Sequence, residues 1–265
     1  MKTIVLLLIF HSGLLLNSSI CEGRASAVVE ETMLNSPERS KPKQEVFVKA
    51  LLVKKCTDFS VTGLGDSPEW KKAEWTHLTK LDSGGISYES KYKILYSASG
   101  IYVLFFGEDD KITTKDYKDF EAIYNGDVFE VFFHPSPKTP VYFEYEINQL
   151  SRELILTLSK TGEQLYSWAP KYPTAEERKP IKKAVSVTGD TPQVGSSLKN
   201  WTAEVFIPYE IMGILLNTPP KSGTIWNANF CRLDYDSGSM IKWSWSPGIQ
   251  KSFHEIDRFL SIQFE

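Results

Sequence analysis

Residues 124 to 148 read Tyr124-Asn-Gly-Asp-Val-Phe-Glu-Val-Phe-Phe-His134, then a proline-rich loop, then Val141-Tyr-Phe-Glu-Tyr-Glu-Ile-Asn148. Both halves alternate with a period of two, which is typical of β-strands. The three prolines between residues 134 and 140 cannot continue a ladder, because proline has no N–H to donate. The stretch therefore predicts a β-hairpin with one apolar face and a second face that carries three carboxylates, Glu130, Glu144 and Glu146.

Composition narrows the class of protein. The chain has 265 residues, enough for one large β domain or two small ones, and 42% of them are hydrophobic, as in globular proteins. Aromatic residues make up 13%, which favours β structure and supplies rings for a binding surface. The formal net charge of −3 gives no basic surface, so nucleic acid is not an expected partner.

The N-terminus resembles an export signal. Lys2 precedes an apolar run over residues 4–16, and Ala25-Ser-Ala27 provides a small-x-small cleavage site. The run is too short for a membrane span, so none is expected once a signal over residues 1–27 is removed. Cleavage after Ala27 predicts a periplasmic, secreted or cell-surface protein, and the alternative is a lipoprotein anchored through Cys21. Residues 28–45 are polar and predict a flexible linker before a domain over 46–265.

Short alternating runs separated by Gly and Pro turns fill that domain. They predict ten or more strands, with short helices near Pro68, over residues 116–123 and from Pro208 to Gly213. We therefore expect an all-β, two-sheet antiparallel β-sandwich with short helices in the connections. The two cysteines of the domain, Cys56 and Cys231, either form a disulfide or remain as buried thiols.

Several motifs, in order, make the chain resemble the family 9 carbohydrate-binding modules and their wider relatives. The resemblance covers about residues 46–265. The motifs are Trp70 after the first strand, Ile101-Tyr-Val-Leu-Phe-Phe before Asp109-Asp110, the stretch from Tyr124 to Phe133, Tyr145-Glu-Ile-Asn148, Trp201-Thr-Ala-Glu204-Val-Phe-Ile207-Pro208, Trp226-Asn-Ala-Asn-Phe-Cys-Arg232, and Ser244-Trp-Ser followed by His254 to Phe259.

The resemblance implies a β-sandwich that holds a sugar between two aromatic rings, with bound calcium in some members, and association with glycoside hydrolases. Taken with the export signal, it predicts an exported, non-catalytic protein that binds oligo- or polysaccharide in carbohydrate catabolism. A surface uptake complex is the other expected partner. Matched by position, the rings fall on Tyr124 and Phe253, and polar groups for the sugar fall on Glu130, Glu146, Asn148 and Gln250. Sugar-binding members carry Trp at both ring positions and Arg where this chain has Glu146.

Three alternatives remain open from the residues alone. Calcium prefers several hard oxygens, and the weak candidates are Asp109, Asp110 and Glu144, with the other hairpin carboxylates and Asp234 and Asp236 as further ligands. A glycoside hydrolase or a hydrolase accessory subunit would use two neighbouring carboxylates such as Glu130 and Glu146. A haem-binding or structural sandwich would use Met212 or Met240 with His254.

Overall fold

The computed structural model describes residues 49–162, 164–168 and 181–265. They belong to a compact unit that runs from Val46 to Glu265. The predicted signal peptide and linker lie outside the described residues. Within the described ranges, no helix is long and apolar enough to cross a membrane.

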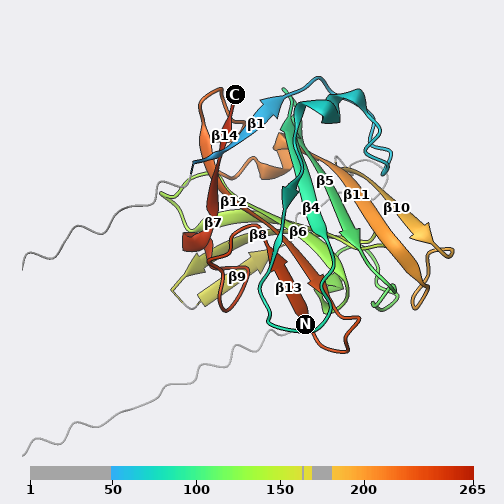
Figure 1. Ribbon diagram of the computed structural model, residues 1–265. Coiled ribbons are helices and arrows are strands. Elements are labelled where there is room, and N and C mark those ends of the chain that lie inside the picture. Colours follow the sequence, from blue (N-terminus) through green and yellow to red (C-terminus); the bar gives the residue numbers. More distant parts are fainter. Residues whose placement is uncertain (1–48, 163, 169–180) are drawn as a thin grey trace, which may run out of the picture. The chain divides into compact units, whose positions relative to one another are not determined.

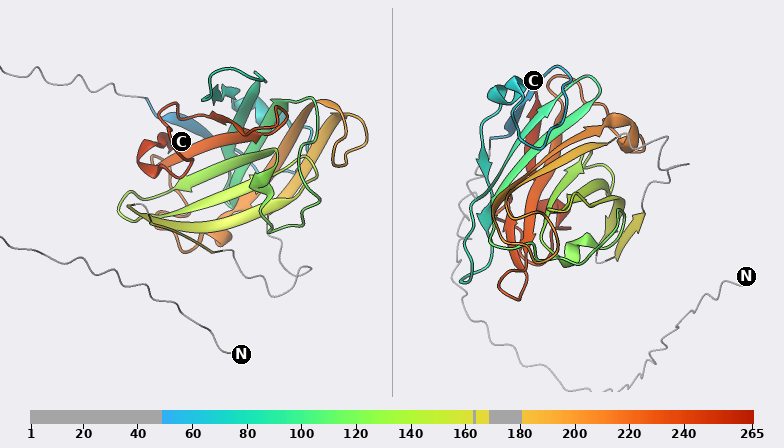
Figure 2. Two further views of the ribbon diagram at one scale, coloured as in Figure 1. Left: turned by 90° about the horizontal axis from the view of Figure 1, so that it is seen from below. Right: turned by 90° about the vertical axis from the view of Figure 1, so that its right-hand side faces the viewer.

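Two sheets pack face to face, joined by one shared strand (Figures 1 and 2), which confirms the predicted sandwich. The β5 sheet contains β2 (Thr76–His77), β4 (Ser90–Tyr96), β5 (Gly100–Glu108), β10 (Lys182–Gly189) and β11 (Leu198–Pro208). The β6 sheet contains β3 (Thr79–Lys80), β6 (Val128–His134), β7 (Val141–Ile147), β8 (Glu153–Thr161), β9 (Gln164–Trp168), β12 (Ile225–Asp234), β13 (Ile241–Ser244) and β14 (Leu260–Phe264).

Strand β1 (Leu51–Lys55) connects the two sheets. Its first half pairs with β14 and its last two residues pair with β4, both in parallel. Every other strand pair is antiparallel among the described residues. Because β1 pairs with a strand of each sheet, the strands follow one continuous order, β10-β11-β5-β4-β1-β14-β12-β6-β7-β8-β9. The sequence predicts a strand over 46–53, whereas β1 begins at Leu51 and extends to Lys55.

Alternate residues of the strands fill the space between the sheets. In the hairpin, Phe129, Val131 and Phe133 of β6 face the core together with Phe143, Tyr145 and Ile147 of β7. They meet aromatic residues of the opposite sheet, and the rings of Phe105 and Phe129 stack with centroids 4.7 Å apart. The predicted hairpin is confirmed, because Glu130 lies directly opposite Glu146 in the β6–β7 register.

The second face of the hairpin is also covered. A second apolar cluster joins Phe132 and Tyr142 of the hairpin to Leu158 of β8 and to Phe253 and Phe259 of the segment before β14. The sequence predicts the core-facing side of this sheet but not this covering layer. Because of this layer, the carboxylate face of the hairpin forms the floor of a pocket rather than a solvated surface.

The short helices are all single 3-10 turns among the described residues: η1 (Pro68–Lys72), η2 (Ile123–Asn125), η3 (Tyr209–Met212) and η4 (Ile256–Arg258). Pro68 opens η1 as predicted, whereas Pro208 ends β11 and precedes η3. The helix predicted over 116–123 is wrong. Phe120 has φ of 68°, which a right-handed helix does not allow, and the backbone N–H of Lys118 donates to the Glu121 side chain instead.

Candidate functional site

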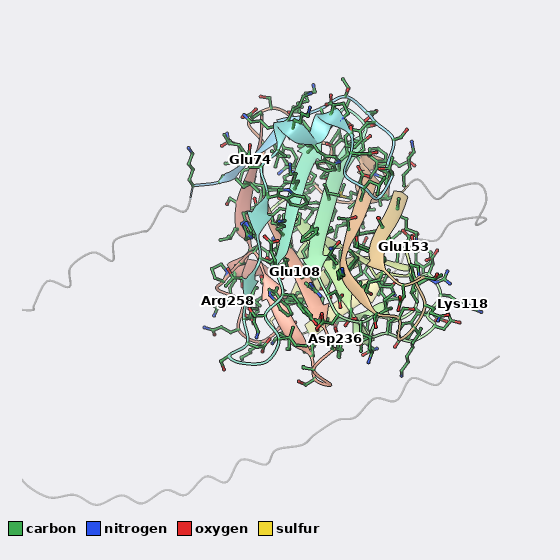
Figure 3. The ribbon with its side chains drawn as sticks, turned by 45° about the vertical axis from the view of Figure 1, so that its right-hand side comes forward. Glu74, Glu108, Lys118, Glu153, Asp236 and Arg258 are labelled. Atoms are coloured by element: carbon green, nitrogen blue, oxygen red, sulfur yellow. The ribbon has the colours of Figure 1, made fainter. Side chains whose placement is uncertain are left out.

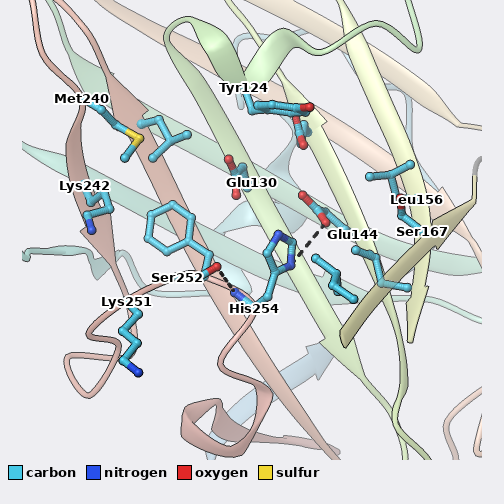
Figure 4. A pocket seen from close by; sticks show the side chains of 15 residues that line it. Tyr124, Glu130, Glu144, Leu156, Ser167, Met240, Lys242, Lys251, Ser252 and His254 are labelled. Carbon is cyan, nitrogen blue, oxygen red and sulfur yellow. Dashed lines mark hydrogen bonds and ion pairs between the residues drawn. The ribbon is translucent and has the colours of Figure 1, made fainter. Parts of the chain in front are cut away.

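A cavity of about 310 Å³ lies on the covered face of the β6 sheet. Its floor is formed by Glu130, Glu144 and Glu146, and its walls include Tyr124 and Phe253, which the family resemblance matched to sugar-stacking rings. Figure 4 shows Tyr124 above Glu130 and Glu144, with His254 on the same side as Glu144. The structure therefore brings four of the six residues predicted for saccharide binding to one pocket.

Tyr124 is held at the pocket mouth by the η2 turn. Tyr124 is 43% exposed, so its ring is accessible to a ligand. Its carbonyl accepts a hydrogen bond from the Tyr235 hydroxyl at 2.9 Å. Gly126 lets the turn pack closely, because a Cβ there would lie 2.5 Å from Thr114 Oγ1. Asp127 then fixes the turn by accepting from the backbone N–H of Thr113 and of Tyr235.

Phe253 belongs to a loop that Glu255 organises. One oxygen of Glu255 accepts from the backbone N–H groups of Gln250, Lys251 and Ser252, and the other pairs with Arg258 at 2.6 Å. Phe253 is only 7% exposed, since its ring also packs with Phe132 in the second apolar cluster. The second predicted ring is thus a pocket wall and a packing residue at once.

The three glutamates of the floor are almost completely buried. Glu130 and Glu146 are register partners, and Glu144 follows on the same face of β7. Among the residues that the structure describes, one oxygen of Glu144 and one of Glu146 have no hydrogen-bond donor. A buried acceptor without a donor costs free energy, so the pocket floor has unused hydrogen-bonding capacity.

Burial raises the pKa of all three floor carboxyls. Desolvation raises the pKa of Glu144 to about 7. For Glu146, repulsion by Glu130 and Glu144 raises the pKa further. Glu144 and Glu146 also influence each other's pKa. The pocket floor therefore binds protons more tightly than ordinary carboxyls do.

This proton binding predicts a pH-dependent stability. Between the ordinary glutamate range and about pH 7 the folded protein holds protons on this cluster that the unfolded chain has lost. The free energy of unfolding should therefore fall as pH rises through that window. Because one unit of pKa shift corresponds to about 1.4 kcal/mol, the effect is on the order of a few kcal/mol.

The measurement is urea unfolding of the wild type and of Glu144→Gln from pH 4.5 to 8. We expect the wild type to lose stability relative to the variant as pH rises, because glutamine cannot ionise. Parallel pH profiles for the two proteins would contradict the prediction, because they would show that Glu144 has the same pKa in the folded and in the unfolded protein.

His254 lies against Glu144 without forming an ion pair at neutral pH. Its Nδ1 is 3.9 Å from a Glu144 oxygen and 2.9 Å from the Tyr142 hydroxyl. Burial lowers the pKa of His254 to about 4, with the positive charge of Lys160 as a second cause. The imidazole is therefore neutral and adds no positive charge to the pocket floor.

Two residues matched by the resemblance lie outside the pocket lining. Asn148 is buried in the β7–β8 turn, where its side-chain oxygen accepts from the backbone N–H of Leu150 and of Arg152. Gln250 is exposed, and its side-chain oxygen accepts from Arg258 at 3.3 Å. The geometry gives Asn148 a turn-forming role and gives Gln250 a place on the loop surface.

The residues predicted as calcium ligands lie in different parts of the structure. Glu144 lies in the pocket, Asp110 is exposed, and Asp109 joins Asp234 and Asp236 in a cluster whose ligand atoms lie within 4.8 Å of one another. Glu108 and Asp236 mark this end of the molecule in Figure 3.

Arg232 already provides a positive charge to this cluster. Its Nη2 is 2.7 Å from Asp234 and 3.2 Å from Asp109, and all three side chains are fully buried. Calcium requires six to eight oxygen ligands, and it could not share these carboxylate oxygens with the guanidinium. The donor set as arranged fits an internal ion-pair network rather than a bound calcium ion.

Cys56 and Cys231 are free, buried thiols. They belong to different apolar clusters, Cys56 beside Trp70 and Cys231 beside Phe132. The structure thus does not contain the disulfide that the sequence left open.

The haem candidates also separate. Met212 is fully buried in the main core, whereas Met240 lines the carboxylate pocket together with His254. No contact of these residues favours a haem ligand role.

Comparison with family models finds a match to the same family over part of the chain. Residues 61–179 match the family model described as carbohydrate family 9 binding domain-like. The resemblance to family 9 is confirmed over this segment. No curated protein matches the chain.

Solved structures share the fold. A candidate carbohydrate-binding protein from Bacteroides uniformis aligns with a TM-score of 0.63 and 18% identity, covering 82% of this chain and 99% of that one. A family 9 module from Caldicellulosiruptor kristjanssonii, solved with glucose and with cellotriose, aligns with a TM-score of 0.56 and 14% identity in both complexes. The alignments cover 82% of this chain and 96% and 94% of the module. At these identities the likeness shows the fold.

Proposed function

We propose that this chain is an exported, non-catalytic carbohydrate-binding protein that captures oligo- or polysaccharide. The observation that carries the proposal is the joint placement of Tyr124, Phe253 and three buried carboxyls in one cavity. An aromatic face covers the C–H face of a sugar, and fixed polar groups bind its hydroxyls. The match to the family 9 model supports the same function.

The size of the cavity suits a small saccharide segment. At about 310 Å³ it stands near the lower end of small-molecule sites, which span roughly 300–1,000 Å³. A second and more polar groove lies beside the loop that carries Phe253. Glu255 and Arg258 and Lys160 of β8 line this groove. A longer glycan chain would continue from the pocket toward this groove.

Export follows from the apolar run at the N-terminus and is part of the proposal. We further propose that the protein works beside glycoside hydrolases or within a surface uptake complex, because a binding module without catalysis serves an enzyme or a transporter. Calcium is not required for the pocket in this proposal, since aromatic rings and carboxyl groups line it directly.

The first test is saccharide binding by the wild type and by Tyr124→Ala. Glucose and cellotriose are the first probes, because a family 9 module of similar fold was solved with both. We expect Tyr124→Ala to weaken binding by about tenfold or more, which corresponds to roughly 1.4 kcal/mol of lost stacking. Isothermal titration calorimetry measures the change directly.

Tyr166→Ala is the matched control. Tyr166 is a 58% exposed tyrosine on β9 between two pocket residues, Leu165 and Ser167, but is not itself part of the lining. The Tyr166→Ala variant should bind the saccharides with the same affinity as the wild type. Equal binding by Tyr124→Ala and Tyr166→Ala would contradict the site, and absence of binding to any glycan on an array would contradict the function.

The enzyme alternative has its own measurement. Glu130 and Glu146 are opposite one another on adjacent strands, a spacing of the kind that a carboxylate pair in catalysis uses. We expect no release of reducing sugar from polysaccharides. Release that disappears in Glu130→Gln would overturn the non-catalytic function.

A further inference from the structure

The pocket floor has more hydrogen-bond acceptors than its own donors satisfy. Glu144 and Glu146 are 3% and 1% exposed, and one oxygen of each has no hydrogen-bond partner among the described residues. Neutral His254 supplies no charge to them. A ligand that fits this floor must bring donors, and a positive charge would satisfy these oxygens best because charge-assisted hydrogen bonds are the strongest.

The arrangement of these carboxyls does not suit a metal ion. Among the described residues, the carboxylate group that converges within 4.8 Å is Asp109, Asp234 and Asp236, and the floor glutamates form no such group. Glu130 and Glu146 are on neighbouring strands and Glu144 is one pleat further along β7. The acceptors thus form a row beneath Tyr124 and the leucines of β8, which suits an extended ligand with a ring face.

The two lysines that line the pocket lie on the side opposite to this row of acceptors. Lys242 is half-buried and Lys251 is exposed, and both lie on the β13 side of the pocket, across from Glu144 (Figure 4). In the described ranges, neither ammonium group forms an ion pair with a floor carboxylate. Solvent screens the exposed charge of Lys251, whereas the buried carboxyls act on a ligand at short range.

We propose that the pocket prefers a saccharide with a free amino group, a hexosamine unit whose amine is not acetylated. The ammonium group binds between Glu144 and Glu146, whose protons are released to solvent as it binds, and the sugar ring packs against Tyr124. The inference rests on the proposed saccharide-binding function and names its ligand class. A neutral sugar has hydroxyl donors but no charge to match three carboxyls in one apolar cavity.

Three trisaccharides of equal length test the preference by calorimetry at pH 6.5 in the presence of EDTA: the glucosamine trimer, its fully N-acetylated form and cellotriose. We expect the wild type to bind the glucosamine trimer roughly tenfold more tightly, or better, than either neutral trimer. The double variant Glu144→Gln/Glu146→Gln should lose this preference. Glu74→Gln, which removes an exposed carboxylate that follows η1 and does not line the pocket, should keep the preference.

The outcomes separate the two proposals. Equal affinity for all three trimers, or tighter binding of cellotriose, would overturn the amino-sugar preference and leave the saccharide function intact. Neutral trimer binding that requires added calcium and fails in Glu144→Gln would also overturn it, since a metal ion would then fill the floor. Failure to bind any trimer or any array glycan would overturn the saccharide function itself. A thermal melt of each variant confirms that the protein tested is folded.

Discussion

Replacing Arg232 with methionine should lower the free energy of unfolding by about 3–5 kcal/mol at pH 7. The guanidinium is fully buried and bonds Asp234 and Asp109, and its other end donates to the Glu108 carbonyl at 2.6 Å and to Ser90. Methionine fills a similar volume but leaves two buried carboxylates without their cation. Equilibrium unfolding in urea measures the loss.

The surrounding residues show how closely the fold is built around this side chain. A Cβ on Gly107 would lie 2.5 Å from an Arg232 nitrogen, so β5 carries glycine at that position. The guanidinium lies 5.1 to 5.7 Å from the rings of Tyr88, Phe129 and Trp243. Trp201 and Gln149 also donate to the Asp109 carboxylate. Removing the charge therefore affects both sheets.

Two controls separate the network from a metal site. Arg232→Lys keeps a point charge but loses the planar fork, so its loss of stability should be intermediate. EDTA should leave the wild-type melting temperature unchanged, since Arg232 supplies the cation to Asp109 and Asp234. A melting temperature that drops with EDTA and recovers with calcium would show a structural metal, and a loss below about 1 kcal/mol in Arg232→Met would contradict the network.

The fold was predictable because its signals are local. The period of two in residues 128–134 and 141–147 fixes the strands, and prolines between them force the turn. Tyr124, Glu130, Glu146 and Phe253 were found through the family resemblance, and the fold brings them together.

The covering layer of the pocket was not predictable from the same signals. Leu154 and Leu158 alternate as an ordinary strand does, and nothing in that alternation tells that they face a second apolar cluster outside the sandwich. Glu255 was missed as a site residue and His254 was considered only as a haem ligand, because their roles depend on contacts with Gln250–Ser252 and with Tyr142. The pattern Gln250-Lys-Ser-Phe-His-Glu255, with Glu three residues after Ser, was the one available sign of a fixed loop.

Several motifs of the resemblance turned out to serve the fold. Asp109, Trp201 and Arg232 come from three separate motifs and meet in one buried network. Trp70, from a fourth motif, donates a hydrogen bond to Glu204 of the Trp201 motif, 134 positions away in the sequence. A family resemblance locates such residues, but only their contacts distinguish structural motifs from ligand-binding ones.

Glu204→Ala should cost about 3–4 kcal/mol of unfolding free energy, since hydrogen bonds to a buried charge are worth about 1.5–3 kcal/mol each and are not additive. Glu204 is fully buried on β11. One of its oxygens accepts from the backbone N–H groups of Thr62 and Gly63 at 2.8 Å, and the other accepts from Trp70 Nε1 at 2.7 Å. The variant would leave these donors without partners and release the segment that precedes η1 from the β5 sheet.

A double-mutant cycle with Trp70→Phe tests this assignment. Phenylalanine keeps the buried ring of residue 70 but removes the indole N–H, so Trp70→Phe should cost clearly less in the Glu204→Ala background than in the wild type. Glu210→Ala, an exposed carboxylate on η3 shortly after the same strand, is the control and should change stability by less than about 0.5 kcal/mol. Additive losses in the cycle would mean that Glu204 and Trp70 stabilise the fold independently, and the loop would then be held by Thr62 and Gly63 alone. Coupling of about 1 kcal/mol or more would establish Glu204 as the point where the first loop of the domain is fixed to the sandwich.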